Sequence, residues 1–233
     1  MTKGYVIKHF LGTSIFFALL FICAGSIEFK AAWYYIALGM LMFVLSLTVL
    51  RISDDLMGER AEASKKAVAW DKKILGLSFL STIGMFVFAG LDDGRFHWSQ
   101  QYFANGTCMN CSIDENIVRA AGLILTAIGQ LMFLVAQKQN PFFSSVVRIQ
   151  SDRGHAVHAK GLYAIVRHPA YLGNIIQAIG FPLLFYSLWV IIPVFLSVLL
   201  TVVRTFKEDA YLKENLAGYS EYAATTRGRL FPF

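Results

Sequence analysis

Long stretches without a charged residue are the feature of this sequence that most limits how it can fold. Four of them hold about 18–20 residues each, which is the length of one helical crossing of a bilayer. These stretches are Phe10–Ile27, Ala31–Leu50, Ile74–Leu91 and Ala120–Gln137. Hydrophobic residues make up 56% of the chain as a whole. The sequence therefore predicts an all-α integral membrane protein.

The last uncharged stretch, Pro169–Val203, is too long for one crossing. As a single helix it would extend roughly 50 Å at 1.5 Å per residue, whereas the hydrocarbon core is about 30 Å thick. Gly180, Pro182 and Pro193 interrupt the stretch, and proline kinks or ends a helix. We expect a tight C-terminal helical hairpin, and hence about five to six transmembrane helices: six crossings, or four crossings with a deep hairpin.

Lysine and arginine are distributed unevenly between the segments that join these stretches. Most of them lie in the N-terminal segment, the 51–73 and 138–168 connections, and the tail from residue 204, whereas the opposite side holds only Lys30, Arg95 and Arg119. The positive-inside rule then predicts that both termini are cytoplasmic. The net charge of +6 is explained by topology and by anionic lipid headgroups, so we expect no nucleic-acid partner.

We expect residues 1–233 to form a single membrane domain. Its first part, 1–137, would hold four spans without a cleavable signal peptide, and its second part, 138–233, would hold the polar clusters. The outer connection, Asp92–Asn116, is interpreted as a structural cap. It contains Cys108-Met109-Asn110-Cys111, where a local disulfide is more plausible than a zinc site, and two glycosylation sequons that begin at Asn105 and Asn110.

The first polar cluster lies directly before the hairpin and reads Arg167-His168-Pro169-Ala170-Tyr171-Leu172-Gly173. Pro169 suits the first turn of a helix, where a missing N–H costs nothing. Arg167 alone could be an anchor at the headgroup level. An anchor requires neither Gly173 nor the upstream Gly161-x-Tyr163, however, and such glycines permit close packing or a positive φ. This context favours a ligand site, because polar groups at a membrane boundary are costly to desolvate.

A second cluster follows the hairpin, with Arg204, Glu208 and Asp209 on the emerging helix. Arg204 and Glu208 are four residues apart and share a helix face, so they could form an ordinary surface ion pair. The hairpin nevertheless returns them to the side of His168, where the two clusters can meet. A third cluster contains His155 and Val157. The segment Gly218–Tyr222 could be part of an amphipathic tail in the interface.

In this order the motifs resemble the isoprenylcysteine carboxyl methyltransferase family. Its signature is Arg-His-Pro-x-Tyr-x-Gly, a hydrophobic stretch and then a pair of acids, with an arginine four residues before the first acid. The resemblance covers roughly 140–233, where His155, Val157, Gly161, Tyr163, Gly218, Tyr219, Tyr222, Arg229 and Pro232 also fit the family register. Segments further upstream look like a microbial branch. Asp209 stands where the family usually has a second glutamate, so we expect Glu208 to matter more.

The resemblance implies a membrane methyltransferase that uses S-adenosylmethionine and no metal. It implies that the cofactor-binding residues are His155, Val157, Gly161, Tyr163, His168, Pro169, Tyr171, Glu208 and Asp209. Arg204 or Arg167 would hold the carboxylate of the methyl acceptor. That acceptor would be a lipophilic or prenylated molecule that arrives laterally from the bilayer.

Three other functions are compatible with parts of the sequence. A phospholipid N-methyltransferase would use the same cofactor with an amine acceptor. An NADPH-dependent sterol or steroid reductase resembles Arg-His-Pro-Asn-Tyr-x-Gly-Glu, but this chain has Ala170 and Asn174 at the distinguishing positions. A transporter should show charged or broken helices in repeated halves, and the first four stretches show neither. The G-x-G-x-x-G fingerprint is absent, which excludes a Rossmann methyltransferase.

Overall fold

The computed structural model describes residues 3–50, 67–104 and 114–232, and within these ranges the chain forms helices and no strands. The predicted all-α fold is confirmed. The two cysteines and the two sequons of the outer connection lie outside the described residues.

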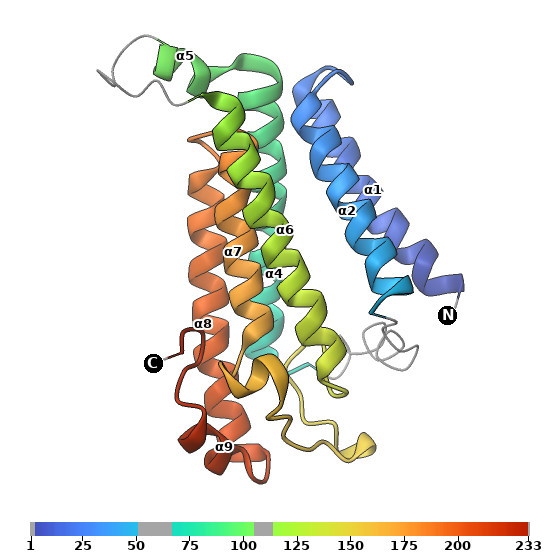
Figure 1. Ribbon diagram of the computed structural model, residues 1–233, viewed down its shortest axis with the longest axis vertical. Coiled ribbons are helices and arrows are strands. Elements are labelled where there is room, and N and C mark those ends of the chain that lie inside the picture. The colour runs from blue at the N-terminus through green and yellow to red at the C-terminus, as the bar shows by residue number, and fades with distance from the viewer. Residues whose placement is uncertain (1–2, 51–66, 105–113, 233) are drawn as a thin grey trace.

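The long helices run roughly along one direction and form a bundle (Figure 1). The elements are α1 (Lys3–Ala24), α2 (Lys30–Thr48), α4 (Ala69–Ala89), the π-helical turn η2 (Gly90–Phe96), α5 (Trp98–Ala104), α6 (Glu115–Gln139), the 3-10 turns η3 (Ser151–Arg153) and η4 (Gly161–Ala164), α7 (Pro169–Leu184), α8 (Ile191–Asn215) and α9 (Tyr219–Thr225).

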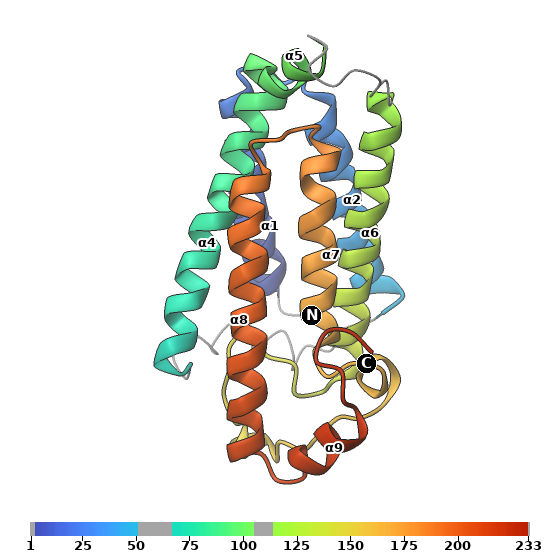
Figure 2. The same ribbon diagram turned by 90° about the vertical axis from the view of Figure 1, so that its left-hand side faces the viewer.

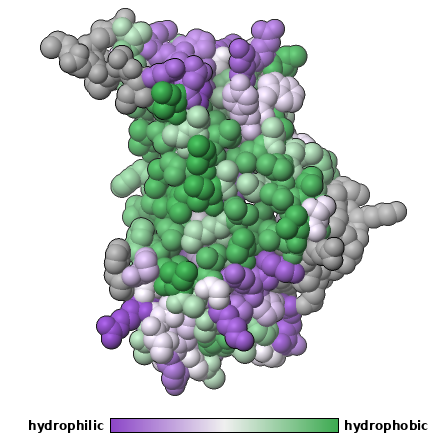
Figure 3. All heavy atoms as spheres, viewed as in Figure 1, coloured by the Kyte–Doolittle hydropathy of each residue, from purple (hydrophilic) through white to green (hydrophobic). Residues whose placement is uncertain are grey.

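Length and composition allow several of these helices to cross a membrane. Among the described residues, Lys30–Thr48, Ala69–Phe96 and Glu115–Gln139 are long and apolar enough, and Phe10–Ala24 is a shorter apolar segment. The surface shows a broad apolar band with hydrophilic residues at both ends (Figure 3). The chain is therefore an integral membrane protein, as predicted.

The predicted hairpin is formed by α7 and α8. Pro169 occupies the first turn of α7, and Pro182 lies near its end. The Ser187 N–H donates to the Pro182 carbonyl in the turn that follows. The α7 helix packs closely on α6, because a Cβ added at Gly173 would lie 2.7 Å from the Gly129 carbonyl oxygen. The close packing expected at Gly173 is thus confirmed, and α6 and α7 form a firm wall.

The end of the bundle that carries η2 and α5, named the outer end after its predicted side, is more ordered than a plain connection. Helix α4 continues into η2, so the residues from Asp92 to Phe96 are helical, and the short helix α5 follows them. Asp92 accepts hydrogen bonds from the backbone and hydroxyl of Ser99 and from the Ser187 hydroxyl in the hairpin turn. Asp93 pairs with Arg119 of α6. These contacts tie α4, α6 and the α7–α8 turn together.

The opposite end carries the polar segments of the second half of the chain. The start of α1, the turns η3 and η4, helix α9 and the C-terminal segment all lie there (Figures 1 and 2). This arrangement agrees with an even number of crossings. The α1–α2 pair approaches the other helices at the outer end and leans away from them toward the opposite end (Figure 1).

Candidate functional site

A polar cavity lies at the end of the bundle that carries α9. Its walls come from the 140–158 segment, η4, the start of α7, the end of α8 and α9. Of the residues predicted from the sequence, those that line it are His155, Val157, Tyr163, Arg167, His168, Pro169, Tyr171 and Glu208. Gly161, Arg204 and Asp209 are not part of its lining. The hairpin therefore brings the two main clusters together, as the sequence predicted.

Asp209 is the centre of an ion-pair network directly beneath this cavity. Its side chain is 1% exposed, and it accepts hydrogen bonds from Arg167 at 2.7 Å and 3.1 Å, from Arg229 at 2.9 Å and from the Tyr219 hydroxyl at 3.1 Å. His168 Nε2 lies 3.5 Å from the same carboxylate. Burial opposes ionisation, but the hydrogen bonds from His168, Arg167 and Arg229 hold the pKa of Asp209 well below its usual range. Asp209 thus fastens the C-terminal segment to α7 and α8.

The guanidinium N–H groups of Arg167 donate hydrogen bonds to other groups of the protein. Besides the bidentate contact with Asp209, its Nη1 donates to the backbone carbonyls of Thr226 and Arg227 at 2.7 Å and 2.8 Å. The backbone N–H groups of Arg167 and His168 donate to the carbonyls of Gly228 and Arg229. The arginine therefore holds the tail in place, and its guanidinium has few donors left for a ligand.

Tyr171 connects the two predicted clusters across the cavity. Its hydroxyl donates to a Glu208 carboxylate oxygen, its ring stacks on His168 with 5.6 Å between centroids, and the Arg204 guanidinium lies over the ring at 5.2 Å. Among the described residues, only Tyr171 donates a hydrogen bond to Glu208. One side of the Glu208 carboxylate therefore remains available to a ligand.

Arg204 forms no ion pair with Glu208, so the interpretation as an ordinary pair on one helix face is wrong. Its Nε and Nη2 donate instead to Asp71 of α4 at 2.7 Å and 3.1 Å, and Nη2 also donates to the Ser145 carbonyl. Asp71 is fully buried and additionally accepts from the Val147 N–H. The contact joins residues 133 positions apart. Sequence reasoning gave Asp71 no role at the site, and its only signal was a charge next to an apolar stretch.

Two histidines from the 140–158 segment face the cavity. His155 Nδ1 accepts from the Gln150 N–H at 3.3 Å and its ring packs on Phe142. His158, which sequence reasoning missed because a lone loop histidine is usually solvated, lies edge-on to Tyr163. Its Nε2 atom is buried and has no hydrogen-bond partner among the described residues. Burial lowers the pKa of both histidines, and at His155 the nearby Arg148 lowers it further.

Gly161 and Tyr163 build the wall behind these histidines. Gly161 has a φ of 61°, which is one of the two properties expected there, and the N–H of Leu162 donates to Gln139 of α6. The Tyr222 hydroxyl donates to the Tyr163 carbonyl at 2.6 Å. Burial raises the pKa of Tyr222 to about 12, so this hydroxyl stays protonated. The wall thus joins η4 to α6 and α9.

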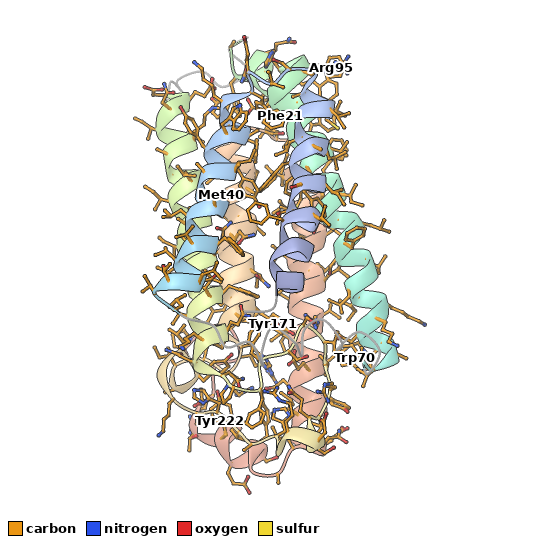
Figure 4. The ribbon with its side chains drawn as sticks, turned by 90° about the vertical axis from the view of Figure 1, so that its right-hand side faces the viewer. Phe21, Met40, Trp70, Arg95, Tyr171 and Tyr222 are labelled. Atoms are coloured by element: carbon orange, nitrogen blue, oxygen red, sulfur yellow. The ribbon has the colours of Figure 1, made fainter. Side chains whose placement is uncertain are left out.

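The assembled site is a pocket at the end of the bundle where Tyr171 and Tyr222 lie (Figure 4). It presents a carboxylate at Glu208, aromatic faces at Tyr171 and Tyr163, and a buried imidazole nitrogen at His158. Such a set can bind a ligand that carries positive charge and hydrogen-bonding groups.

Comparison with known proteins adds one finding. A search of curated proteins gave no match. Residues 120–214 match the family model of the isoprenylcysteine carboxyl methyltransferase (ICMT) family. This range contains α7, nearly all of α8 and most of the cavity lining, including His155, His168 and Glu208. The 120–214 segment of this chain is therefore similar to the isoprenylcysteine carboxyl methyltransferase family.

Proposed function

We propose that this protein is an S-adenosylmethionine-dependent membrane methyltransferase that methylates a carboxylate on a lipophilic acceptor. The observation that carries the proposal is the polar cavity, which combines the Glu208 carboxylate with the Tyr171 ring inside the family segment. Its position beside the apolar bundle suits an enzyme with a water-soluble cofactor and a membrane-dissolved acceptor.

The residues present fit the proposed cofactor. S-adenosylmethionine, when bound, supplies an activated methyl group on a sulfonium, and it also carries an ammonium, a carboxylate and an adenine. Glu208 would pair with the ammonium, and Tyr171 would face the sulfonium through a cation–π contact, worth about 0.5–2 kcal/mol. The unpartnered His158 Nε2, together with His155 and the backbone near Val157, would bind the remaining polar groups. His168, Pro169, Gly161, Tyr163 and Asp209 would shape the pocket.

The acceptor carboxylate would be held by Arg204 and not by Arg167. The described residues use Nε and Nη2 of Arg204 and leave Nη1 without a hydrogen bond, whereas all three nitrogens of Arg167 are engaged. A carboxylate is ionised at neutral pH, so no general base is required. The contribution of the protein is then to exclude water and align the acceptor.

The same proposal places the polar cavity in the cytoplasm. Lysine and arginine are concentrated in the segments at this end of the bundle, and the positive-inside rule assigns such an end to the cytoplasm. Both termini would then be cytoplasmic, on the side from which the cofactor is supplied.

Titration calorimetry of the purified protein in detergent tests the proposal. We expect binding of S-adenosylmethionine and of its demethylated product, and no comparable binding of NADPH. Tight binding of NADPH alone would point to a reductase. The acceptor class is tested by transfer of a tritiated methyl group into membrane extracts. Methyl esters release volatile label in base, whereas the methylated amines of a phospholipid N-methyltransferase do not.

A further inference from the structure

A second cavity lies within the apolar part of the bundle, between the α1–α2 pair and helices α4, α6 and α7. Its volume is about 430 Å³. We call it the amide chamber, because the side chains of Gln130, Gln137, Asn174 and Gln177 line it. Met40 of α2 also lines the chamber. Along the bundle axis it lies between Arg95, at the outer end, and Tyr171, toward the opposite end (Figure 4).

The four amides lie on one wall of the chamber, which is formed by α6 and α7. Gln130 and Gln137 are seven residues apart on α6, and Asn174 and Gln177 are three residues apart on α7, so each pair shares a helix face. The two helices are locked by close backbone contact, since a Cβ added at Gly129 would lie 2.4 Å from the Gly173 carbonyl oxygen. Facing them are mostly aromatic and aliphatic side chains of α1 and α2.

Side-chain amides inside an apolar bundle are costly unless they are hydrogen-bonded. The Oε1 atom of Gln130 is buried and has no partner among the described residues. Nearby hydroxyls are different, because Ser46 donates to the Phe43 carbonyl at 2.6 Å and Thr82 to the Ser78 carbonyl at 2.9 Å within their own helices. The amide chamber therefore contains hydrogen-bonding capacity that its own walls do not use.

The amide chamber adjoins the polar cavity. Asn174 lies one helical turn beyond Tyr171, which lines the polar cavity. Phe133 lines the amide chamber and packs against Tyr163 and Ala170, which line the polar cavity. A chain-like molecule in the amide chamber would therefore have one end close to Tyr171.

We propose that the amide chamber binds the chain of the methyl acceptor and prefers an aliphatic chain carrying a neutral hydrogen-bonding group over a plain hydrocarbon chain. The identity of this ligand as the acceptor rests on the proposed function. A hydroxyl or amide in the chain both donates and accepts, so it satisfies Gln130 in either orientation of its amide. A plain chain leaves buried amides unpaired, and a site built for hydrogen bonding rejects an analogue that lacks the group.

The test compares two probes that differ in one hydroxyl. Equilibrium binding of a radiolabelled long-chain fatty acid is measured against the same acid with a mid-chain hydroxyl, on the purified full chain in detergent without any methyl donor. We expect the hydroxylated acid to bind about five-fold more tightly, the effect of one neutral hydrogen bond. Gln130→Met, which keeps the side-chain length, should abolish the preference, and Gln177→Met provides a second variant.

Thr201→Val is the matched control, because the Thr201 hydroxyl donates to the Ser197 carbonyl of its own helix and does not line the amide chamber. This variant should keep the preference. Equal binding of the two acids by the unaltered protein, or a preference that survives both glutamine substitutions, would overturn the inference. The two proposals fail separately: absent binding of the methyl donor contradicts the function, whereas efficient methylation of plain-chain acceptors in preference to hydroxylated ones contradicts only the inference.

Discussion

The two ends of the bundle both contain buried carboxylates with arginine partners, yet they are built differently. At the outer end, Asp93 pairs with Arg119, which also contacts Glu115 and the Leu184 carbonyl. Asp92 accepts three hydrogen bonds from Ser99 and Ser187. At the opposite end, Asp209 and Asp71 hold Arg167 and Arg204 in the same manner. A cavity lies beside the ion pairs at each end, and the one at the outer end is lined by Asp93, Glu115 and Arg119 themselves.

The two ends differ in how many of their polar groups still lack hydrogen-bond partners once the structural contacts are made. The carboxylates of the outer end are matched by donors from neighbouring helices. At the opposite end, Glu208 and the His158 Nε2 atom line a cavity, and among the described residues Glu208 has one hydrogen-bond partner and His158 Nε2 has none. A buried ion pair thus marks a structural clamp as readily as a functional site, and the unmatched groups identify the site.

The largest effect should come from disrupting the ion pairs that Asp209 forms with Arg167 and Arg229. Asp209→Asn leaves the buried Arg167 without a charged partner and loosens Arg229, and breaking such a pair typically costs about 3–5 kcal/mol of stability. Asp93→Asn should cost less, because Arg119 keeps Glu115. Thermal unfolding of both variants in detergent measures the difference. Equal losses would show that the two ends are equally dependent on their ion pairs.

Glu208→Gln should separate binding from stability. The substitution removes the negative charge that we assign to the cofactor ammonium, and hydrogen bonds to charged groups are worth about 1.5–3 kcal/mol, so cofactor affinity should fall by about ten-fold or more. The unfolding temperature should change little. Glu214→Gln, an exposed carboxylate on the same helix, should leave both quantities unchanged. Calorimetry and thermal unfolding of each variant provide the measurements, and an unaltered affinity would remove Glu208 from the site.

Arg204→Lys should lower turnover while cofactor affinity changes little. A lysine cannot reproduce the planar fork that contacts Asp71 and keeps Nη1 for the acceptor, so we expect roughly a ten-fold loss in turnover, about 1.4 kcal/mol in the barrier. Arg119→Lys changes the corresponding arginine of the outer end and should alter stability only. Parallel assays of affinity and turnover distinguish these outcomes. Near-normal turnover in the Arg204 variant would exclude a catalytic role.

The sequence predicted those features that depend on local chemistry. Charge-free stretches indicated the helices, the interruptions at Gly180, Pro182 and Pro193 indicated the hairpin, and Gly161 indicated a close backbone approach or a positive φ. It did not predict the partner of Arg204, because Asp71 is 133 positions away and only tertiary packing brings them together. It also could not distinguish the contacts of Glu208 and Asp209, since neighbouring residues on a helix point about 100° apart. Glu208 therefore lines the cavity, whereas Asp209 forms the ion pairs with Arg167 and Arg229.

The smallest expected effect is the pH dependence of cofactor binding. Burial lowers the pKa of His158 in the folded protein, so the unfolded chain takes up the proton first, and this residue's contribution to stability is lost as pH falls below the ordinary histidine value of about 6.5. If the neutral imidazole binds the cofactor, affinity should fall about three-fold as the pH is lowered from neutrality to below the lowered pKa of His158 in the folded protein. His158→Gln should flatten this dependence, whereas His97→Gln at the outer end should not. Calorimetry across this pH range checks the expectation, and an unchanged pH dependence in the His158 variant would assign the titration to another group, with His155 the next to test.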